Sequence, residues 1–163
     1  MTMMPDERAA AIARYRGGYA ALVAAMDGVT AAELDAHPIE GEWSIREIVH
    51  HVADGELSSA IRLRRLIVED RPLLLGYDEA QYARVLWYGE RRIEPSLASV
   101  ESTRATTADI LDRLDDAGWD RTGIHGEVGE YGVEAWFAIY TEHPYDHADQ
   151  VRRVRAALAA AHT

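Results

Sequence analysis

Four long stretches of this sequence place their apolar residues three or four positions apart, which is the spacing of a helix with one buried face. They cover about residues 5–26, 44–70, 95–117 and 133–161, and turn-forming residues separate them. Because a helix with one apolar face must bury it against another element, the pattern predicts an all-α four-helix bundle. A chain of 163 residues can bury a core of its own, so we expect a single domain over residues 1–163.

Local signals mark where two of the helices begin. Ser44 and Glu47 have the S-x-x-E spacing of a capping box, directly before the apolar residues of the second long helix. Thr30 and Glu33 have the same spacing, which predicts a short helix over about 30–36. Both boxes support a helical assignment that does not depend on periodicity.

The connections between the long helices differ in character. Residues 72–95 show little periodicity, and we expect a long crossover between the second and third long helices, with a short helix near 78–88. Residues 119–132 are rich in glycine and alternate in polarity, which predicts an irregular loop or a small hairpin.

Composition excludes several classes of function. The chain has no cysteine, so it has no disulfide, thiolate zinc site or cysteine nucleophile, and any thiol chemistry must come from a small molecule. The formal net charge of −11 would repel nucleic acid over most of the surface. The longest apolar runs fall short of the ~20 residues of a membrane span, and charge near the N-terminus argues against a signal peptide. We therefore expect a cytoplasmic protein with neither nucleic-acid nor membrane partners.

The last predicted helix carries two histidines four residues apart. A helical wheel gathers its apolar side chains into a stripe about 100° wide, made of Val133, Trp136, Phe137, Tyr140, Val151, Val154 and Leu158. His147 lies inside this stripe, and His143 lies about 20° outside its edge. The H-x-x-x-H spacing therefore puts both imidazoles on one face, as in other helical metal sites.

The same spacing has a simpler explanation, because such pairs arise often by chance. Each ring can instead be a core or boundary histidine that is hydrogen-bonded to a backbone carbonyl or an acidic neighbour. Pro144 adds a further expectation, since it cannot donate to the carbonyl of Tyr140 and should kink the helix there.

The adjacent pair His50 and His51 offers a third ligand. On the second long helix His51 lies about 60° outside the apolar stripe, whereas His50 lies about 100° outside it. This favours His51 as the ligand and His50 as a residue that faces solvent. Three neutral imidazoles match the donor set of a catalytic metal site, for which zinc is the default and nickel or iron is also suitable.

Four carboxylates lie within about a turn of these histidines. Asp54, Glu56, Glu142 and Asp146 can act as a general base or accept a hydrogen bond from an imidazole N–H. For each of them a solvated surface carboxylate is the simpler expectation. As catalytic residues, Asp146, Glu142 and Asp54 are weak candidates.

Other residues can line a substrate pocket without binding metal. The four tryptophans, Trp43, Trp87, Trp119 and Trp136, either line such a pocket or pack in the core and at its boundary. His125, in the glycine-rich connection, either lies near the pocket or is an ordinary loop residue.

Three segments in this order resemble one known family. They are GEWSIREIVHHVADGE at 41–56, RPLLLGYDEAQYARV at 71–85 and YTEHPYDHADQV at 140–151. Together they resemble the DinB superfamily and, within it, the YfiT-like proteins, which are candidate metal-dependent hydrolases related to bacillithiol S-transferases. The resemblance covers about residues 20–155.

This resemblance implies a four-helix bundle with a long crossover between its second and third helices, often as a homodimer. It implies that His51, His143 and His147 hold a divalent ion, with zinc or nickel as first choices and iron or manganese as alternatives. A low-molecular-weight thiol is an implied co-substrate. The sequence departs from the family pattern at Glu142, where a tryptophan is usual, at Pro144, and at Asp146, where a histidine is usual.

The expected function is that of a metal-dependent enzyme. The ion would activate a small thiol, as in an S-transferase, or water, as in a hydrolase, against a small-molecule electrophile or a hydrolysable substrate. The alternatives are a non-catalytic metal-binding stress-response protein and a dimeric interaction module.

Overall fold

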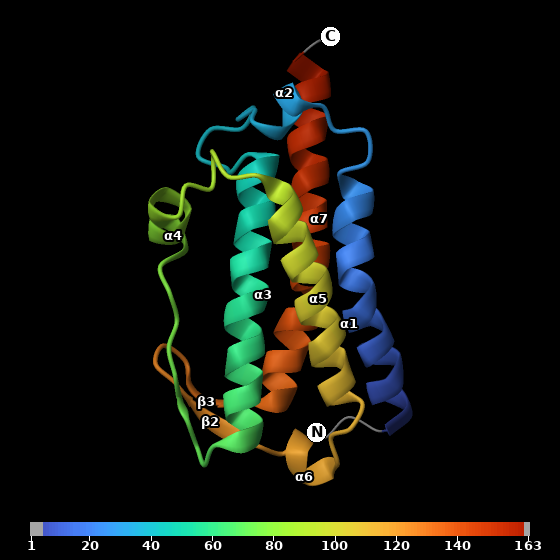
Figure 1. The fold of residues 1–163 in the computed structure, drawn as a ribbon, viewed down its shortest axis with the longest axis vertical. Helices are drawn as coiled ribbons and strands as arrows, with labels where there is room; N and C mark the ends of the chain where they lie inside the picture. The colour runs from blue at the N-terminus through green and yellow to red at the C-terminus, as the bar shows by residue number, and fades with distance from the viewer. Residues whose placement is uncertain (1–4, 162–163) are drawn as a thin grey trace.

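A computed structural model describes residues 5–161 of the chain as a helical bundle with a small sheet at its side (Figure 1). The elements in chain order are α1 (Pro5–Ala25), α2 (Ala31–Leu34), α3 (Ile45–Val68), β1 (Leu73–Leu74), α4 (Glu79–Val85), α5 (Ile93–Leu111), α6 (Asp116–Trp119), β2 (Thr122–His125), β3 (Gly129–Gly132) and α7 (Val133–Ala161). None of the helices within this range is long and apolar enough to cross a membrane.

The four long helices pack as a bundle in which α1 and α3 each contact both α5 and α7. In Figure 1, α3 and α5 run in the same direction, and α1 and α7 run in the opposite one. Helices α3 and α5 can be parallel because residues 69–92, with β1 and α4, carry the chain back along the outside of the bundle. This confirms the predicted all-α four-helix bundle with a long crossover.

Both predicted capping boxes are present. The backbone N–H of Ser44 donates to the Glu47 carboxylate at 2.8 Å, and the Ser44 hydroxyl oxygen accepts from the Glu47 N–H at 3.3 Å. Thr30 and Glu33 make the reciprocal pair at the start of α2. The start of α3 is thus fixed five residues before the histidine pair.

The third long helix was expected over 95–117, but α5 covers Ile93–Leu111 and a separate short helix, α6, follows. The Asp115 side chain accepts a hydrogen bond from the Gly118 N–H at 2.8 Å and so caps the new helix. Pro95 lies in the first turn of α5, where its missing N–H has no intrahelical acceptor.

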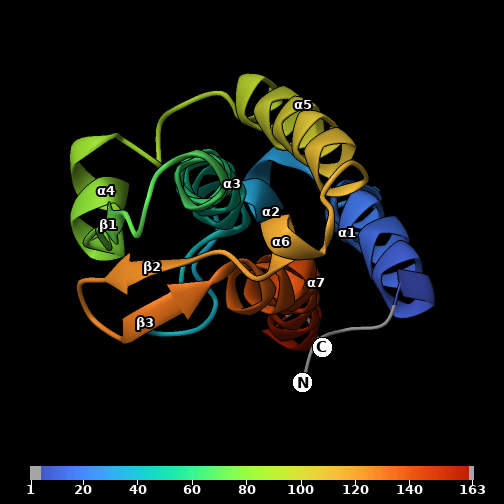
Figure 2. The ribbon, with the colours of Figure 1, turned by 90° about the horizontal axis from the view of Figure 1, so that it is seen from below.

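The glycine-rich connection forms a small hairpin, which is one of the two structures expected for it. Strands β2 and β3 are antiparallel, with His125 paired with Gly129 at the turn. Strand β1 of the crossover adds to β2 in parallel, with Leu73 opposite Ile124 and Leu74 opposite His125. This third strand was not predicted, since it is two residues long and pairs with a segment some fifty positions away. Figure 2 shows the sheet to one side of α7, with β1 and α4 beside α3.

Two apolar clusters fill the bundle, and a polar layer lies between them. One contains Tyr15, Leu63, Leu66, Trp119, Trp136 and Phe137, and the other contains Leu22, Ile45, Ile48, Val52, Ala148 and Val151. Most of the predicted stripe on α7 is buried in these clusters. The stretch of α7 from Tyr140 to His147 lies between them and carries the candidate site.

Candidate metal centre

Three histidines from two helices meet inside the bundle. His51 of α3 and His143 and His147 of α7 each offer a ring nitrogen, and these nitrogens lie within 4.8 Å of one another. Ring centroids are 4.6 Å apart for His51 and His147, 4.7 Å for His143 and His147, and 5.5 Å for His51 and His143. His51 is 3% exposed, and the two rings on α7 are half-buried.

Hydrogen bonds leave ring nitrogens free for the centre of the cluster. His143 Nδ1 lies 3.3 Å from Oε1 of Glu56, and His147 Nδ1 lies 2.9 Å from Oε1 of Gln150. Both acceptors require an N–H at Nδ1, which leaves the lone pair on Nε2 of each ring. Nδ1 of His51 is buried and makes no hydrogen bond to any residue in the described range. A partner for the outer nitrogen is usual for metal-binding histidines.

The His51 and His147 rings are neutral at ordinary pH. Burial, assisted by the two neighbouring imidazoles, lowers the pKa of His51 to about 3. Burial and the nearby His143 lower the pKa of His147 to about 4. Neutral imidazole is the form that binds metal. The cluster fits a divalent cation because its donors are imidazole nitrogens, two of its rings are neutral, and the buried Nδ1 of His51 has no partner among the described residues.

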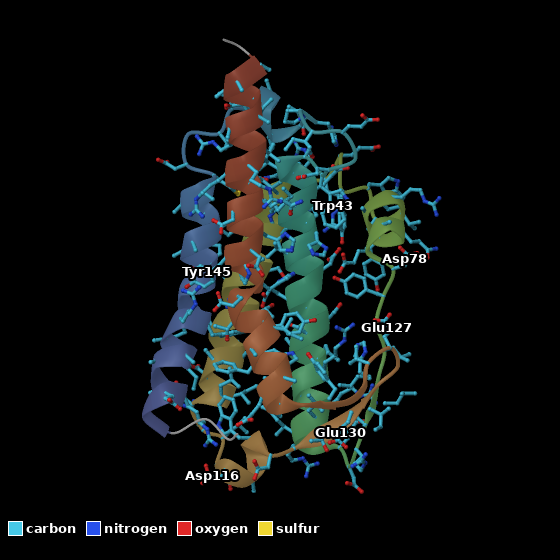
Figure 3. The ribbon with its side chains drawn as sticks, turned by 180° about the vertical axis from the view of Figure 1, so that it is seen from behind. Trp43, Asp78, Asp116, Glu127, Glu130 and Tyr145 are labelled. Atoms are coloured by element: carbon cyan, nitrogen blue, oxygen red, sulfur yellow. The ribbon has the colours of Figure 1, made fainter. Side chains whose placement is uncertain are left out.

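Two neighbours shape the space around the rings. A Cβ atom added to Gly55 would lie 2.8 Å from Cε1 of His143 and 3.3 Å from its Nε2, so glycine at this position makes room for the ring. The Trp43 ring packs against His51 with centroids 4.6 Å apart. In Figure 3 Trp43 lies near the upper end of α3, on the side of the hairpin residue Glu127.

Glu56 was expected to be a solvated carboxylate, and the structure shows that this was wrong. It is fully buried and pairs with Arg104 of α5, with Nη1 and Oε1 2.7 Å apart. The role of Arg104 was not predicted either. A signal existed, since Glu56 lies four residues after Val52 and seven before Leu63, both on the buried stripe of α3.

The three weak catalytic candidates have partners other than the histidines. Asp54 accepts a hydrogen bond from the hydroxyl of Tyr88 at 2.6 Å. Glu142 pairs with Arg14 of α1 at 2.5 Å, and Asp146 is exposed and interacts with the same arginine. The structure therefore does not bring the Glu142 and Asp146 carboxylates into the cluster.

His50 was expected to face solvent, and this was also wrong. It is fully buried, with Nδ1 2.8 Å from the Ser96 hydroxyl and Nε2 3.1 Å from the Arg91 carbonyl. The Tyr88 ring lies 5.6 Å away. The end of the crossover and the start of α5 cover this face of α3, which a helical wheel of α3 alone cannot show. Burial lowers the pKa of His50 as well.

The four tryptophans have different surroundings, and Trp87 has neither of the two predicted roles. Trp119 and Trp136 are buried in the core, where Trp136 donates to the Ser59 carbonyl at 2.8 Å. Trp87 is 62% exposed, and Trp43 packs against the cluster.

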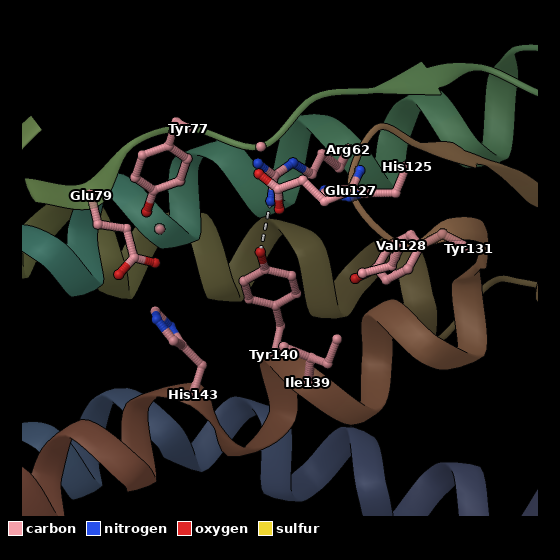
Figure 4. Close-up of a pocket in the computed structure, with 12 residues that line it drawn as sticks. Arg62, Tyr77, Glu79, His125, Glu127, Val128, Tyr131, Ile139, Tyr140 and His143 are labelled. Atoms are coloured by element: carbon pink, nitrogen blue, oxygen red, sulfur yellow. Dashed lines mark hydrogen bonds between the residues drawn. The ribbon is translucent and has the colours of Figure 1, made fainter. Parts of the chain in front are cut away.

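A pocket of about 280 Å³ adjoins the cluster on the side of His143 (Figure 4). The crossover, the hairpin, α3 and α7 all contribute to its wall, and Figure 4 labels Arg62, Tyr77, Glu79, His125, Glu127, Val128, Tyr131, Ile139, Tyr140 and His143. Arg62 donates to the Tyr140 hydroxyl at 3.0 Å and to the Leu75 carbonyl at 2.6 Å. Burial raises the pKa of the Tyr77, Tyr131 and Tyr140 hydroxyls, which remain protonated donors. His125 thus lies at the pocket rather than in an isolated loop.

Comparisons with known proteins agree with this architecture. YfiT from Bacillus subtilis, which has an unusual four-helix bundle topology, superposes with a TM-score of 0.90 at 22% identity, over 97% of this chain and 91% of YfiT. The mycothiol-dependent maleylpyruvate isomerase superposes with a TM-score of 0.71 at 15% identity, over 93% of this chain and 63% of the isomerase.

Sequence comparison establishes the family. A protein of Geobacillus kaustophilus named "putative metal-dependent hydrolase" is 30% identical over 145 residues, which are 88% of this chain and 82% of the relative. The profile of the DinB superfamily matches residues 14–151. Since this match covers most of the chain, the protein belongs to the DinB superfamily.

Proposed function

We propose that the protein binds one divalent metal ion through His51, His143 and His147 and is a metal-dependent enzyme. The observation that carries this proposal is the convergence of three imidazole nitrogens, from two helices, within 4.8 Å. Three protein ligands are the usual donor set of a catalytic zinc site, whereas structural sites usually have four. Zinc or nickel suits three nitrogens best, with iron and manganese as alternatives.

A bound ion would supply Lewis acidity and lower the pKa of a water molecule or a thiol in its coordination sphere. The residues around it hold the ligands and the substrate. Glu56 and Gln150 orient two of the imidazoles, and Trp43 covers the third. These contacts fix the rings before any ligand arrives, which reduces the reorganisation that binding requires.

The pocket beside His143 is the proposed substrate site. Its volume of about 280 Å³ suits a small molecule, and its wall combines phenol hydroxyls, the Arg62 guanidinium and the Glu79 and Glu127 carboxylates. Figure 4 shows the Glu79 carboxylate and the His143 ring projecting into the same space from opposite walls. A small polar substrate that offers both donors and acceptors would match these groups.

Water is the first candidate nucleophile, because the relative from Geobacillus kaustophilus is named "putative metal-dependent hydrolase". A small thiol is the second. A protein of the same fold depends on mycothiol, as its name states, and this chain has no cysteine of its own.

The test is turnover by protein loaded with Zn²⁺ or Ni²⁺, with and without small thiols. A panel of activated esters and amides would detect hydrolysis, and a chromogenic aryl halide would detect thiol transfer. Activity without thiol supports the hydrolase, and activity only with thiol supports the transferase. His147→Ala should be inactive in both assays. If no metal and no substrate of either panel gives turnover, the enzymatic proposal fails.

A non-catalytic role as a metal-binding stress-response protein is favoured by one observation, namely that the ligands join α3 to α7. In that case removing the ion would lower the melting temperature sharply, and no substrate would be turned over.

A homodimer is a further proposal, in line with the dimeric interaction module that the sequence left open. Leu57, Ile61 and Leu75 are 47%, 60% and 66% exposed beside one shallow groove between α3 and the crossover. Light scattering would check the oligomeric state, and Ile61→Lys should give a monomer if this face forms the contact.

A further inference from the structure

An ion pair lies at the centre of the bundle, where charge is costly. The side chains of Arg104 and Glu56 are 1% and 0% exposed, and Nη1 of the arginine lies 2.7 Å from Oε1 of the glutamate. Taking two charges out of water costs more than their attraction returns unless further hydrogen bonds satisfy both groups. Their other partners therefore explain how the pair is tolerated.

Arg104 satisfies its donors on three other helices. Nε donates to the Tyr15 carbonyl of α1 at 2.9 Å, Nη2 donates to the same oxygen, and the guanidinium stacks 3.8 Å from the Tyr15 ring. Nη1 also donates to the Tyr140 carbonyl of α7 at 3.0 Å. This carbonyl lacks its usual helical donor because residue 144 is a proline. The predicted free carbonyl thus becomes an anchor for Arg104.

Glu56 connects Arg104 to the candidate metal centre. The oxygen that accepts from Arg104, Oε1, also lies 3.3 Å from Nδ1 of His143. A carboxylate beside a guanidinium is an acceptor, so His143 must carry its hydrogen on Nδ1. The Cε1 edge of the His143 ring packs closely against Gly55, one residue earlier on α3, where no Cβ atom is in the way.

We infer that Glu56 and Arg104 are positioning residues that hold His143 with its unprotonated Nε2 toward His51 and His147. The inference rests on the proposed metal site. Arg104 holds the Glu56 carboxylate in place, and this carboxylate sets the tautomer and orientation of the His143 ring. Because Pro144 has no N–H, the Tyr140 carbonyl of α7 is available to accept a hydrogen bond from Arg104.

The other two histidines lack a partner of this kind. His147 is held by the neutral amide of Gln150 on its own helix. Nδ1 of His51 has no hydrogen bond to any residue between 5 and 161. Loss of the Glu56 carboxylate should therefore affect the His143 ring and leave the other two rings unchanged.

The experiment compares two matched double variants. Glu56→Gln alone leaves a buried unpaired guanidinium and can fail to fold, so the test variant is Glu56→Gln with Arg104→Met, which removes both charges. The control is Glu142→Gln with Arg14→Met. It removes a second Arg–Glu pair, whose glutamate precedes His143 in the chain but whose carboxylate does not contact the ring.

Two readouts separate this inference from the proposed function. The first is the ¹⁵N NMR shift pattern of His143 in metal-free protein, which reports the tautomer without any ion. We expect the Nδ1–H form in wild type and control, and a mixture of tautomers in the test variant. The second is the Zn²⁺ dissociation constant from competition with a chromophoric chelator, which should rise about 10- to 100-fold in the test variant only.

An unchanged His143 tautomer in a folded test variant would overturn the inference, as would equal Zn²⁺ affinities in the test and control variants. If wild type binds no metal, the proposed function fails, and the tautomer measurement still decides whether Glu56 positions the ring.

Discussion

Two buried histidines adjacent in the chain, His50 and His51, have opposite surroundings. Both ring nitrogens of His50 have protein partners, the Ser96 hydroxyl and the Arg91 carbonyl. Nδ1 of His51 has none among the residues the structure describes, and its ring faces His143 and His147.

The comparison shows that burial alone does not identify a ligand. A buried histidine whose nitrogens are all hydrogen-bonded is satisfied as it stands and stabilises the fold. The buried Nδ1 of His51 has no hydrogen-bond partner in the described range and its ring faces two other imidazoles, so a cation is a partner that suits this ring.

The largest expected effect is loss of metal when the ligand is removed. His51→Ala should weaken Zn²⁺ binding by more than about 100-fold, beyond the range seen when only an outer partner of a ligand is lost. His50→Ala should keep its metal and instead lose about 1–3 kcal/mol of stability, because the buried Ser96 hydroxyl loses its partner, whereas the Arg91 carbonyl still accepts from Arg46. Metal analysis after dialysis measures the loss of Zn²⁺, and urea unfolding measures the loss of stability. Equal metal loss in both variants would contradict the assignment of His51 and not His50 as the ligand.

The next effect is stabilisation by the ion. Free Zn²⁺ at one hundred times its dissociation constant should add about 2.7 kcal/mol to the free energy of unfolding. The His50→Ala variant should gain a similar increment from Zn²⁺, and His51→Ala should gain none. Thermal unfolding with and without Zn²⁺ measures this, and an equal shift in both variants would place the ion elsewhere.

A smaller effect is expected from pH in metal-free protein. Folding lowers the pKa of His51 to about 3 and that of His147 to about 4, below the value near 6.5 of the unfolded chain. The unfolded state therefore takes up protons as pH falls from about 6.5 to 4, and the free energy of unfolding decreases by up to about 1.4 kcal/mol per pH unit for each histidine.

The control for this pH effect is the double variant His51→Gln/His147→Gln, whose stability should change less over the same range. Urea unfolding at several pH values gives both slopes. Parallel slopes for the two proteins would show that these rings already bind protons in the folded state.

The smallest expected effect comes from Gly55→Ala. The new methyl would meet His143 at 2.8 Å and displace its ring, so Zn²⁺ affinity should fall by about tenfold at most. Ser58→Ala on the same helix is the control and should leave affinity unchanged. A loss of affinity in both variants would attribute it to α3 as a whole.

Much of the fold was predictable because helical periodicity and caps are local signals. The Ser44–Glu47 box and the apolar stripe of α7 placed two helices and put His143 and His147 on one face. What was missed depends on contacts between distant segments. Strand β1 exists only because β2 lies beside it, and His50 is buried only because the crossover covers it.

The carboxylates show a second reason for failure. Glu56 was assigned to the surface because of its charge, although its position on α3 matches buried neighbours. Its burial depends on Arg104, which lies 48 positions away and occupies a core position between the buried residues Val100 and Ala108. A charge in a core position predicts a partner on a facing helix, but the sequence does not say which one.

The histidines come from the long helices, whereas much of the pocket wall comes from connections between helices, through Tyr77, Glu79 and the hairpin residue His125. In the proposed function, the ligands would thus come from the long helices alone, whereas the pocket that would select the substrate draws on both the helices and the connections. Loops tolerate mutation better than packed helices do. If the proposed function holds, substitutions in these connections should change which substrate is accepted without removing the ion.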